Sequence, residues 1–286
     1  MKVTLILVPY HLGQERVGMG LGPECFIQRG ISRGLNSQDH DVIIETVRYD
    51  NNTGQGEFAA VAEINALLAE KMRAAVEQRR FPLVLAGNCN SCLGALAGLG
   101  RQMVGIVWLD AHGDFNTPQT STSDFLDGMA LAMATGLYRP ALLTGLGGLP
   151  IPGSHVVHIG GRDFDAGERE RLVQHGVHLI PASQLKQIGS DAMLRSALAL
   201  LRSQAEAVYL HVDLDVLDPA EGRANEFAAP HGLSLRGLEC IIQMVGETFA
   251  MKAAALTAYD PTGDEGGRAL RAGLRLIHTI VKVVDS

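Results

Sequence analysis

Hydrophobic residues along this chain follow two patterns, short continuous runs and longer stretches with helical spacing. The short runs predict strands that are buried on both faces, because a strand of a parallel sheet covered by helices has no polar face. Eight such strands are predicted, over residues 3–8, 42–47, 82–86, 104–109, 156–159, 177–180, 208–212 and 253–256.

The stretches between these strands carry the helical pattern. Phe58, Val61, Ile64 and Leu68 recur at helical spacing and predict a long amphipathic helix over 56–80. Ser91 is in position to cap the helix over 91–99. The other predicted helices span 23–35, 126–136, 167–175, 192–202, 235–248 and 265–284. The alternation predicts an α/β fold: a single domain over 1–286, with three layers and a mainly parallel sheet of about eight strands.

Composition and charge narrow the classes of function. The chain has 286 residues and a formal net charge of -7, without a basic stripe, so a nucleic-acid partner is not expected. It lacks the run of ~18 apolar residues that a membrane span requires. Its four cysteines do not resemble the disulfide framework of a small secreted protein, and its apolar start is too short for a signal peptide. A cytoplasmic protein is expected.

Polar residues gather directly after two of the predicted strands. Asp110, His112 and Asp114 alternate after one strand, and Asp213 and Asp215 repeat the pattern after another. Alternating residues at a strand end point to one face, and open parallel sheets bind ligands beyond the carboxyl ends of their strands. Carboxylates with an imidazole suit one or two divalent cations. A single aspartate in such a place would more often form a turn, which is the interpretation for Asp218 before Pro219.

Cys89 follows the strand 82–86 and leaves three interpretations open. As a thiolate it would be a metal ligand, and as a small apolar residue it would pack in the core. Cys89 and Cys92 also form a Cys-x-x-Cys pattern before a helix, which keeps a dithiol redox protein as an alternative.

The two aspartate-rich stretches resemble the motifs of a known superfamily. Asp110-Ala111-His112-Gly113-Asp114 is similar to the Asp-Ala-His-x-Asp motif of the ureohydrolases, which include arginase, agmatinase and formimidoylglutamase. The stretch 213–219 is similar to their Asp-x-Asp-x-x-Asp-Pro motif, and the similarity spans nearly the whole chain in the right order. The resemblance implies an arginase-like fold and a hydrolase that cleaves carbon–nitrogen bonds of linear amidines. Because the family is often trimeric or hexameric, a homo-oligomer is compatible with it.

The resemblance also implies a cofactor of two Mn(II) ions. Asp110 and Asp213 would bridge the ions. Asp114 would complete the ligand shell of the first ion, and His112 and Asp215 would complete that of the second ion. Cys89 stands where the family has a histidine ligand, and a thiolate would also accept zinc, cobalt or iron. Two such ions supply a nucleophile at neutral pH by lowering the pKa of water. Asp114 could then carry a proton to the leaving amine.

The substrate contacts resemble those of arginases. Asn116 and Ser123 match donors to the substrate α-carboxylate, and Asp165 matches an acceptor for the α-amino group. The resemblance therefore implies a small-molecule partner, an arginine-like amino acid.

At two positions near the expected amidine group of the substrate, the chain departs from the arginase pattern. Asp127 replaces the histidine that shuttles protons, which makes it the second catalytic candidate beside Asp114. Ala258 replaces the glutamate that pairs with the guanidinium, a loss worth ~3 kcal/mol or more. A cysteine in place of the histidine ligand, together with the absence of the proton-shuttling histidine, resembles the branch of Nω-hydroxy-L-arginine amidinohydrolases. Nω-Hydroxy-L-arginine is therefore the favoured substrate. The alternatives are an arginase or other amidinohydrolase, and a family member that binds metal and an amino acid without turnover.

Overall fold

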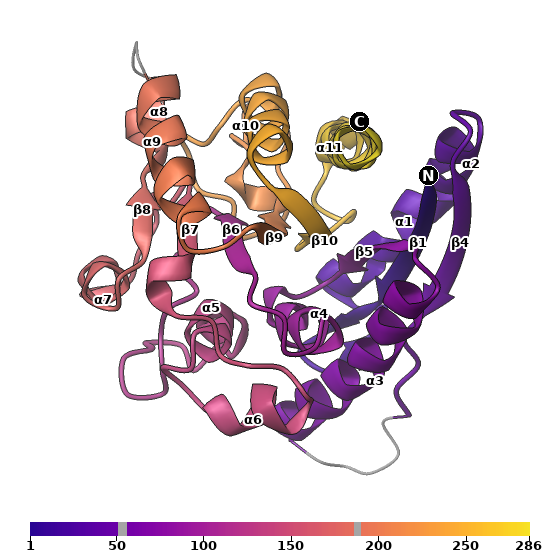
Figure 1. The fold of residues 1–286 in the computed structure, drawn as a ribbon. Coiled ribbons are helices and arrows are strands. Elements are labelled where there is room, and N and C mark those ends of the chain that lie inside the picture. The colour runs from indigo at the N-terminus through magenta and orange to yellow at the C-terminus, as the bar shows by residue number, and fades with distance from the viewer. Residues whose placement is uncertain (51–55, 186–189) are drawn as a thin grey trace.

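A twisted sheet of eight parallel strands runs through the middle of the molecule (Figure 1). This is the architecture of residues 1–50, 56–185 and 190–286, which the computed structural model describes. From one edge to the other the strands are β4 (Asp41–Thr46), β1 (Lys2–Val8), β5 (Phe81–Ala86), β10 (Ala250–Thr257), β9 (Ala207–Asp213), β6 (Gly105–Leu109), β7 (Val156–Ile159) and β8 (His178–Ile180). Each predicted strand is present, and each strand pair is parallel.

Helices cover both faces of this sheet and complete the three predicted layers (Figure 1). One face carries α1 (Gly22–Gln28), α2 (Ile31–Asn36), α9 (Ser190–Arg202), α10 (Leu235–Thr248) and α11 (Arg268–Asp285). The other carries α3 (Glu57–Glu77), α4 (Cys92–Gly98), α5 (Ala130–Ala134) and α6 (Pro140–Gly145), while α7 (Glu168–Gln174) and α8 (Ala182–Leu185) lie toward β8. Leu5 and Leu7 pack into one hydrophobic cluster and Ile6 and Val8 into the other, as expected for a strand buried on both faces.

Several short elements differ from the prediction. The helix predicted over 23–35 is divided into α1 and α2 by Gly30, whose φ of 87° lies in the left-handed region. The helix predicted over 126–136 begins as the 3₁₀ helix η3 (Asp127–Met129). The hairpin of β2 (Tyr10–His11) and β3 (Gln14–Glu15) and the helices α6 and α8 lie in segments for which no helix or strand was predicted. Elements of two to six residues are too short to display a hydrophobic period.

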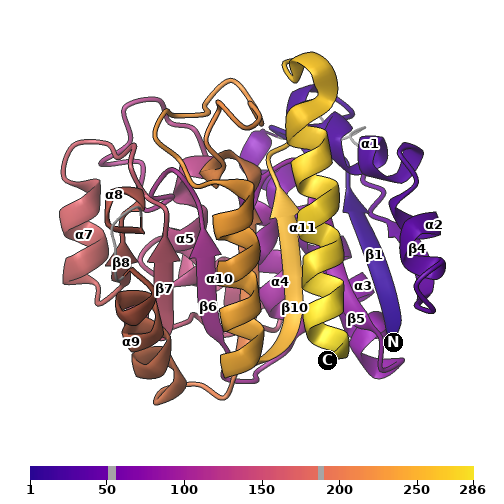
Figure 2. The same ribbon diagram turned by 90° about the horizontal axis from the view of Figure 1, so that it is seen from above.

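The carboxyl ends of all eight strands lie on the same side of the molecule, which is at the top in Figure 2. The two chain ends lie together on the opposite side, where the N-terminal ammonium group is 3.1 Å from Asp285. The remaining short elements are the 3₁₀ helices η1 (Gly18–Leu21), η2 (Cys89–Ser91), η4 (Gly153–His155), η5 (Leu214–Val216) and η6 (Glu265–Gly267). None of the helices in the described ranges combines the length and the apolar character needed to cross a membrane.

Candidate active site

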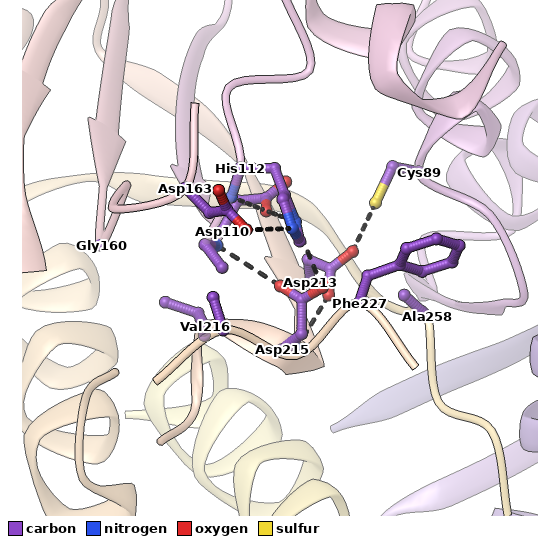
Figure 3. A network of polar contacts seen from close by, with 12 residues as sticks. Cys89, Asp110, His112, Gly160, Asp163, Asp213, Asp215, Val216, Phe227 and Ala258 are labelled. Carbon is purple, nitrogen blue, oxygen red and sulfur yellow. Dashed lines mark hydrogen bonds and ion pairs between the residues drawn. The ribbon is translucent and has the colours of Figure 1, made fainter. Parts of the chain in front are cut away.

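The candidate metal ligands lie at or just after the carboxyl ends of three strands (Figure 3). Asp110 and Asp213 stand at the ends of β6 and β9, which pair directly in the sheet. Cys89 lies in η2, just after β5. Gly87 allows this approach, because a Cβ there would collide with the backbone of Tyr10 and Gly20. The sheet order therefore brings together residues that are far apart in the sequence.

Two groups of side chains are close enough to hold a metal ion, and they share one aspartate. Cys89, Asp110 and Asp213 form the first group, and Asp110, His112 and Asp215 form the second. In each group the ligand atoms lie within 4.8 Å of one another. A shared carboxylate between two groups is the arrangement that a pair of bridged cations requires. Asp110 lies where its predicted bridging role requires, whereas Asp213, the other predicted bridge, belongs to the first group alone. Both bridging roles stay predictions.

Hydrogen bonds orient these carboxylates. Asp110 accepts from the Trp108 indole at 2.8 Å and from the His112 backbone amide at 2.7 Å. Asp213 accepts from the Asp215 amide at 2.8 Å, and Asp215 lies 3.3 Å from the His112 ring. Such partners fix ligand orientation before any ion binds.

The charges of the two groups are balanced differently. In the second group burial would raise the pKa of Asp215, but His112 outweighs it and lowers that pKa to about 2. Burial would likewise lower the pKa of His112, and Asp215 and Asp110 raise it instead. In the first group burial, Asp215 and Asp110 raise the pKa of Asp213 well above its usual range. The crowded carboxylates of the first group therefore favour protonation of Asp213, which a bound cation would oppose.

Asp114 lies beside the first group and has no partner for its buried Oδ2 atom among the described residues. Burial and the charges of Asp110, Asp127 and Asp213 raise its pKa well above the usual range. Its φ of 49° is a strained conformation for a residue with a side chain, of the kind found at functional sites. An unpartnered acceptor among crowded carboxylates fits a divalent cation, which would supply both the partner and the missing positive charge.

The thiol of Cys89 points at this group. Its Sγ atom donates to Asp213 at 2.9 Å and lies 3.2 Å from the Thr257 hydroxyl, which in turn is 3.3 Å from His211. Burial and the charge of Asp213 raise the pKa of the thiol, and a coordinated cation would reverse this. Cys92 faces a different partner, the Ala130 carbonyl oxygen at 3.8 Å, so its thiol does not share the contacts of Cys89.

A cavity of about 270 Å³ opens above these groups. Cys89, His112, Asp114, Asp213 and Asp215 line it, and we call this part of its lining the floor. All three predicted substrate-binding residues, Asn116, Ser123 and Asp165, also line it. The cavity is of a size that holds one small molecule above the candidate metal groups.

One side of this cavity, which we call the amino-acid end, is lined by Asn116, Asp165 and Glu168 and is held by a dense hydrogen-bond network. Asn116 donates to Asp165 at 2.8 Å and accepts from Arg171 at 2.6 Å. Glu168 accepts from the amides of Phe115 and Asp165, at 2.9 and 3.1 Å. Together these bonds fix two carboxylates, those of Asp165 and Glu168, on one side of the cavity.

The amidine end, which we define by Asp127, Ala258, Phe125 and Phe227, is built differently. Asp127 accepts from the Asn88 amide group at 2.6 Å and from the Asn90 backbone at 2.7 Å, so both of its oxygens already hold the Cys89 loop. Burial raises its pKa to about 6. Ser91, predicted to cap the helix α4, makes no such bond, and the Gly94 amide that it would cap donates to the Asn65 side-chain oxygen at 2.6 Å instead. These contacts support a positioning role for Asp127, and its catalytic role stays a prediction.

Four residues of the site were missed by the sequence analysis. Glu168 is buried in the cavity wall, but at the start of a charged helix it looked like an ordinary exposed residue. Asn225 and the two phenylalanines lie in irregular loops, which give no periodic signal. Phe125 and Phe227 were nevertheless detectable in principle, as large apolar residues in loops that are otherwise small and polar.

Comparisons with known proteins agree with this geometry over the full length. Residues 1–282 match the model of the Arginase family. Arginase from Bacillus caldovelox is 30% identical over 97% of each chain, and arginase from Bacillus subtilis (strain 168) is 29% identical, covering 98% of this chain and 97% of its own. The crystal structure of arginase from Bacillus cereus superposes with a TM-score of 0.89 at 30% identity, covering 98% of both chains.

Proposed function

The chain belongs to the arginase family and is a hydrolase acting on carbon–nitrogen bonds of linear amidines, and we propose that its favoured substrate is Nω-hydroxy-L-arginine. The proposal also includes the cofactor, two manganese ions. Cys89, Asp110 and Asp213 would hold one ion with Asp114, and His112 and Asp215 would hold the other with the shared Asp110. When bound, the ions lower the pKa of water enough to supply a nucleophile at neutral pH.

The protein's own residues would hold the amino-acid part of the substrate. Asp165 and Glu168 present carboxylates for the α-amino group, and Ser123 and Asn116 are the candidate contacts for the α-carboxylate. Asn116 already donates to Asp165, so it would orient that carboxylate as well as the substrate. This clamp favours a zwitterionic amino acid over agmatine, which lacks the carboxylate.

At the reacting end Asp114 would handle the proton. Its buried Oδ2 atom has no partner among the described residues, and it lies in the cavity floor. A carboxylate in this position would accept a proton from the attacking water and pass it to the leaving nitrogen. The bond that breaks joins the amidine carbon to the δ-nitrogen, and the products are L-ornithine and hydroxyurea.

One observation carries the choice of substrate: the amidine end offers Ala258 and phenylalanine rings where a free carboxylate would be needed to pair with a guanidinium. Asp127 does not replace that carboxylate, because its two oxygens already bind the Cys89 loop. A hydroxyguanidine is less basic than a guanidine, so it loses less when the counter-charge is absent.

The test is a substrate panel on manganese-loaded protein. L-Arginine, Nω-hydroxy-L-arginine, agmatine and formimidoylglutamate are supplied in parallel, and urea, hydroxyurea, formamide and the amine products are measured. The expected result is turnover of Nω-hydroxy-L-arginine above all others. Failure to hydrolyse it would refute the proposed substrate.

The second candidate is L-arginine, and a specific observation favours it. The relatives that match this chain over nearly its full length, at 29–30% identity, are named arginases. Urea release from L-arginine that equals or exceeds hydroxyurea release would establish this candidate instead. Binding of either amino acid without any turnover would indicate a family member that has lost catalysis.

The metal proposal has its own test in Cys89→His. Imidazole and carboxylate suit manganese better than a thiolate does, so the substitution should tighten Mn(II) binding to the first group by about tenfold. Titration calorimetry measures this, with Cys92→Ser as the matched control. Unchanged binding in Cys89→His would show that the thiol is not a ligand.

A further inference from the structure

Two phenylalanine rings from distant loops stack against each other in the wall of the cavity. The rings of Phe125 and Phe227 have their centroids 5.4 Å apart at an interplanar angle of 27°. Met19 and Ala258 line the same cavity, so an apolar corner adjoins the metal-binding floor. In Figure 3 the Phe227 side chain extends toward the side of the site where Cys89 and Ala258 lie. We call the two rings the aromatic wall.

The aromatic wall is tied to a candidate metal ligand through Asn225. The Phe227 amide donates to the Asn225 side-chain oxygen at 2.9 Å. The amide nitrogen of the same side chain donates to the Ala258 carbonyl at 2.8 Å and to Asp215 at 3.3 Å. Asn225 is only 3% exposed, so these bonds are shielded from water. Phe227 is 41% exposed, but its backbone is therefore fixed in position relative to Ala258 and Asp215.

Phe125 is supported from its other side. Its ring meets the His11 ring edge-on, with centroids 6.5 Å apart at 80°. Its backbone amide donates to the Ser123 hydroxyl at 3.3 Å. The backbone of Phe125 is thus connected to Ser123, a predicted contact of the substrate α-carboxylate.

The wall offers no hydrogen-bond acceptor to a bound substrate. An amidine whose terminal nitrogen is NH₂ would turn N–H groups toward rings and methyl groups, where they would stay unpaired. Replacing one of these hydrogens with a methyl group removes a donor and adds contact with the rings, and a hydroxyl group exchanges the N–H for a rotatable O–H that can turn away from them. We infer that Phe125 and Phe227 are specificity residues that select amidines whose terminal nitrogen carries a small substituent.

This inference rests on the proposed function and deepens it by naming a class. The members are Nω-substituted L-arginines, and hydrolysis of each consumes one water and gives L-ornithine and the corresponding N-substituted urea. Ring faces also attract cations, which would favour the charged guanidinium of unsubstituted L-arginine. Cation attraction would thus favour both L-arginine and its methyl derivative over the less basic hydroxyguanidine, whereas the wall favours both substituted compounds over L-arginine.

The experiment compares L-ornithine release from L-arginine, Nω-methyl-L-arginine and Nω-hydroxy-L-arginine by the manganese-loaded protein. Nω-Methyl-L-arginine keeps the positive charge of L-arginine and adds only an apolar group. The comparison therefore measures the contribution of the aromatic wall without a change of charge. The native chain should prefer it to L-arginine by about tenfold in kcat/KM, the range of one methyl group in an apolar pocket. Phe227→Ala should reduce this ratio to about one, and Phe227→Leu should retain part of it.

Leu200→Ala serves as the matched control, because Leu200 is an exposed apolar residue of α9 outside the cavity and its truncation should leave the ratio unchanged. A ratio that stays the same in Phe227→Ala would overturn the inference. A native preference for L-arginine over Nω-methyl-L-arginine would do so too.

Failure of the proposed function gives a different pattern. If the native protein hydrolyses none of the three compounds, that proposal fails, and the wall is tested by titration calorimetry with the same ligands. A tenfold tighter binding of Nω-methyl-L-arginine than of L-arginine that is lost in Phe227→Ala would support the wall. Equal affinities would refute it.

Discussion

The amino-acid end and the amidine end of the cavity differ in how their polar groups are used. At the amino-acid end, Asp165 and Glu168 are held by a network of charged and amide groups, and both face the cavity. At the amidine end, Asp127 bonds to the Cys89 loop, and the remaining surface is alanine and phenylalanine. One end presents carboxylates and amides to the cavity, while the other presents apolar side chains. This difference supports the proposed substrate, whose reacting group is less basic than a guanidine.

The metal groups beneath both ends should give the largest effect. Asp110→Asn removes the carboxylate shared by the two groups. Catalysis should fall by at least about 10³-fold, because several kcal/mol of transition-state stabilisation by the ions would be lost. Activity on the best substrate and manganese content are measured together. A variant that keeps both would show that the groups do not form one site.

The amidine end is tested by restoring the missing carboxylate. Ala258→Glu should change the ratio of kcat/KM for L-arginine to that for Nω-hydroxy-L-arginine by about 10²-fold in favour of L-arginine, since a paired buried charge is worth ~3 kcal/mol. Ala258→Gln is the matched control, with the same volume and no charge. If both variants shift the ratio equally, volume rather than charge determines the selectivity.

The amino-acid end is tested by weakening its clamp. Asp165→Asn should raise KM for the amino-acid substrate about tenfold with little change in kcat, because the contact is made equally in the ground state and the transition state. Glu170→Gln, an exposed residue of α7, is the control. A fall in kcat at constant KM would instead place Asp165 in the chemistry.

Asp127 should give the smallest effect. Asp127→Asn keeps the shape and disturbs one of the two bonds to the Cys89 loop, so a loss of about 3- to 10-fold in kcat is expected from a positioning residue. The pH profile of kcat distinguishes the alternatives. A loss of 10²-fold or more, together with disappearance of a step near pH 6, would identify Asp127 as a proton-transfer group.

The sequence predicted the strands and the ligand-bearing loops, because both are local patterns. Buried runs mark the strands, and Asp110, His112, Asp213 and Asp215 stand in short alternating motifs whose convergence follows from a parallel sheet. The contacts of Asp127 were not predictable, since they join segments 37 and 39 residues apart. Asn225 likewise connects a loop to Asp215 and Ala258 through tertiary contacts alone. Manganese, a homo-oligomer and a cytoplasmic location stay predictions.

The most direct test of the altered amidine end is a competition experiment. Equal concentrations of L-arginine and Nω-hydroxy-L-arginine are supplied together to the manganese-loaded protein, and urea and hydroxyurea are quantified at early times. Their ratio equals the ratio of the two kcat/KM values. A hydroxyurea excess of tenfold or more is predicted. An excess of urea would contradict the account and identify the protein as an arginase whose guanidinium contact lies elsewhere.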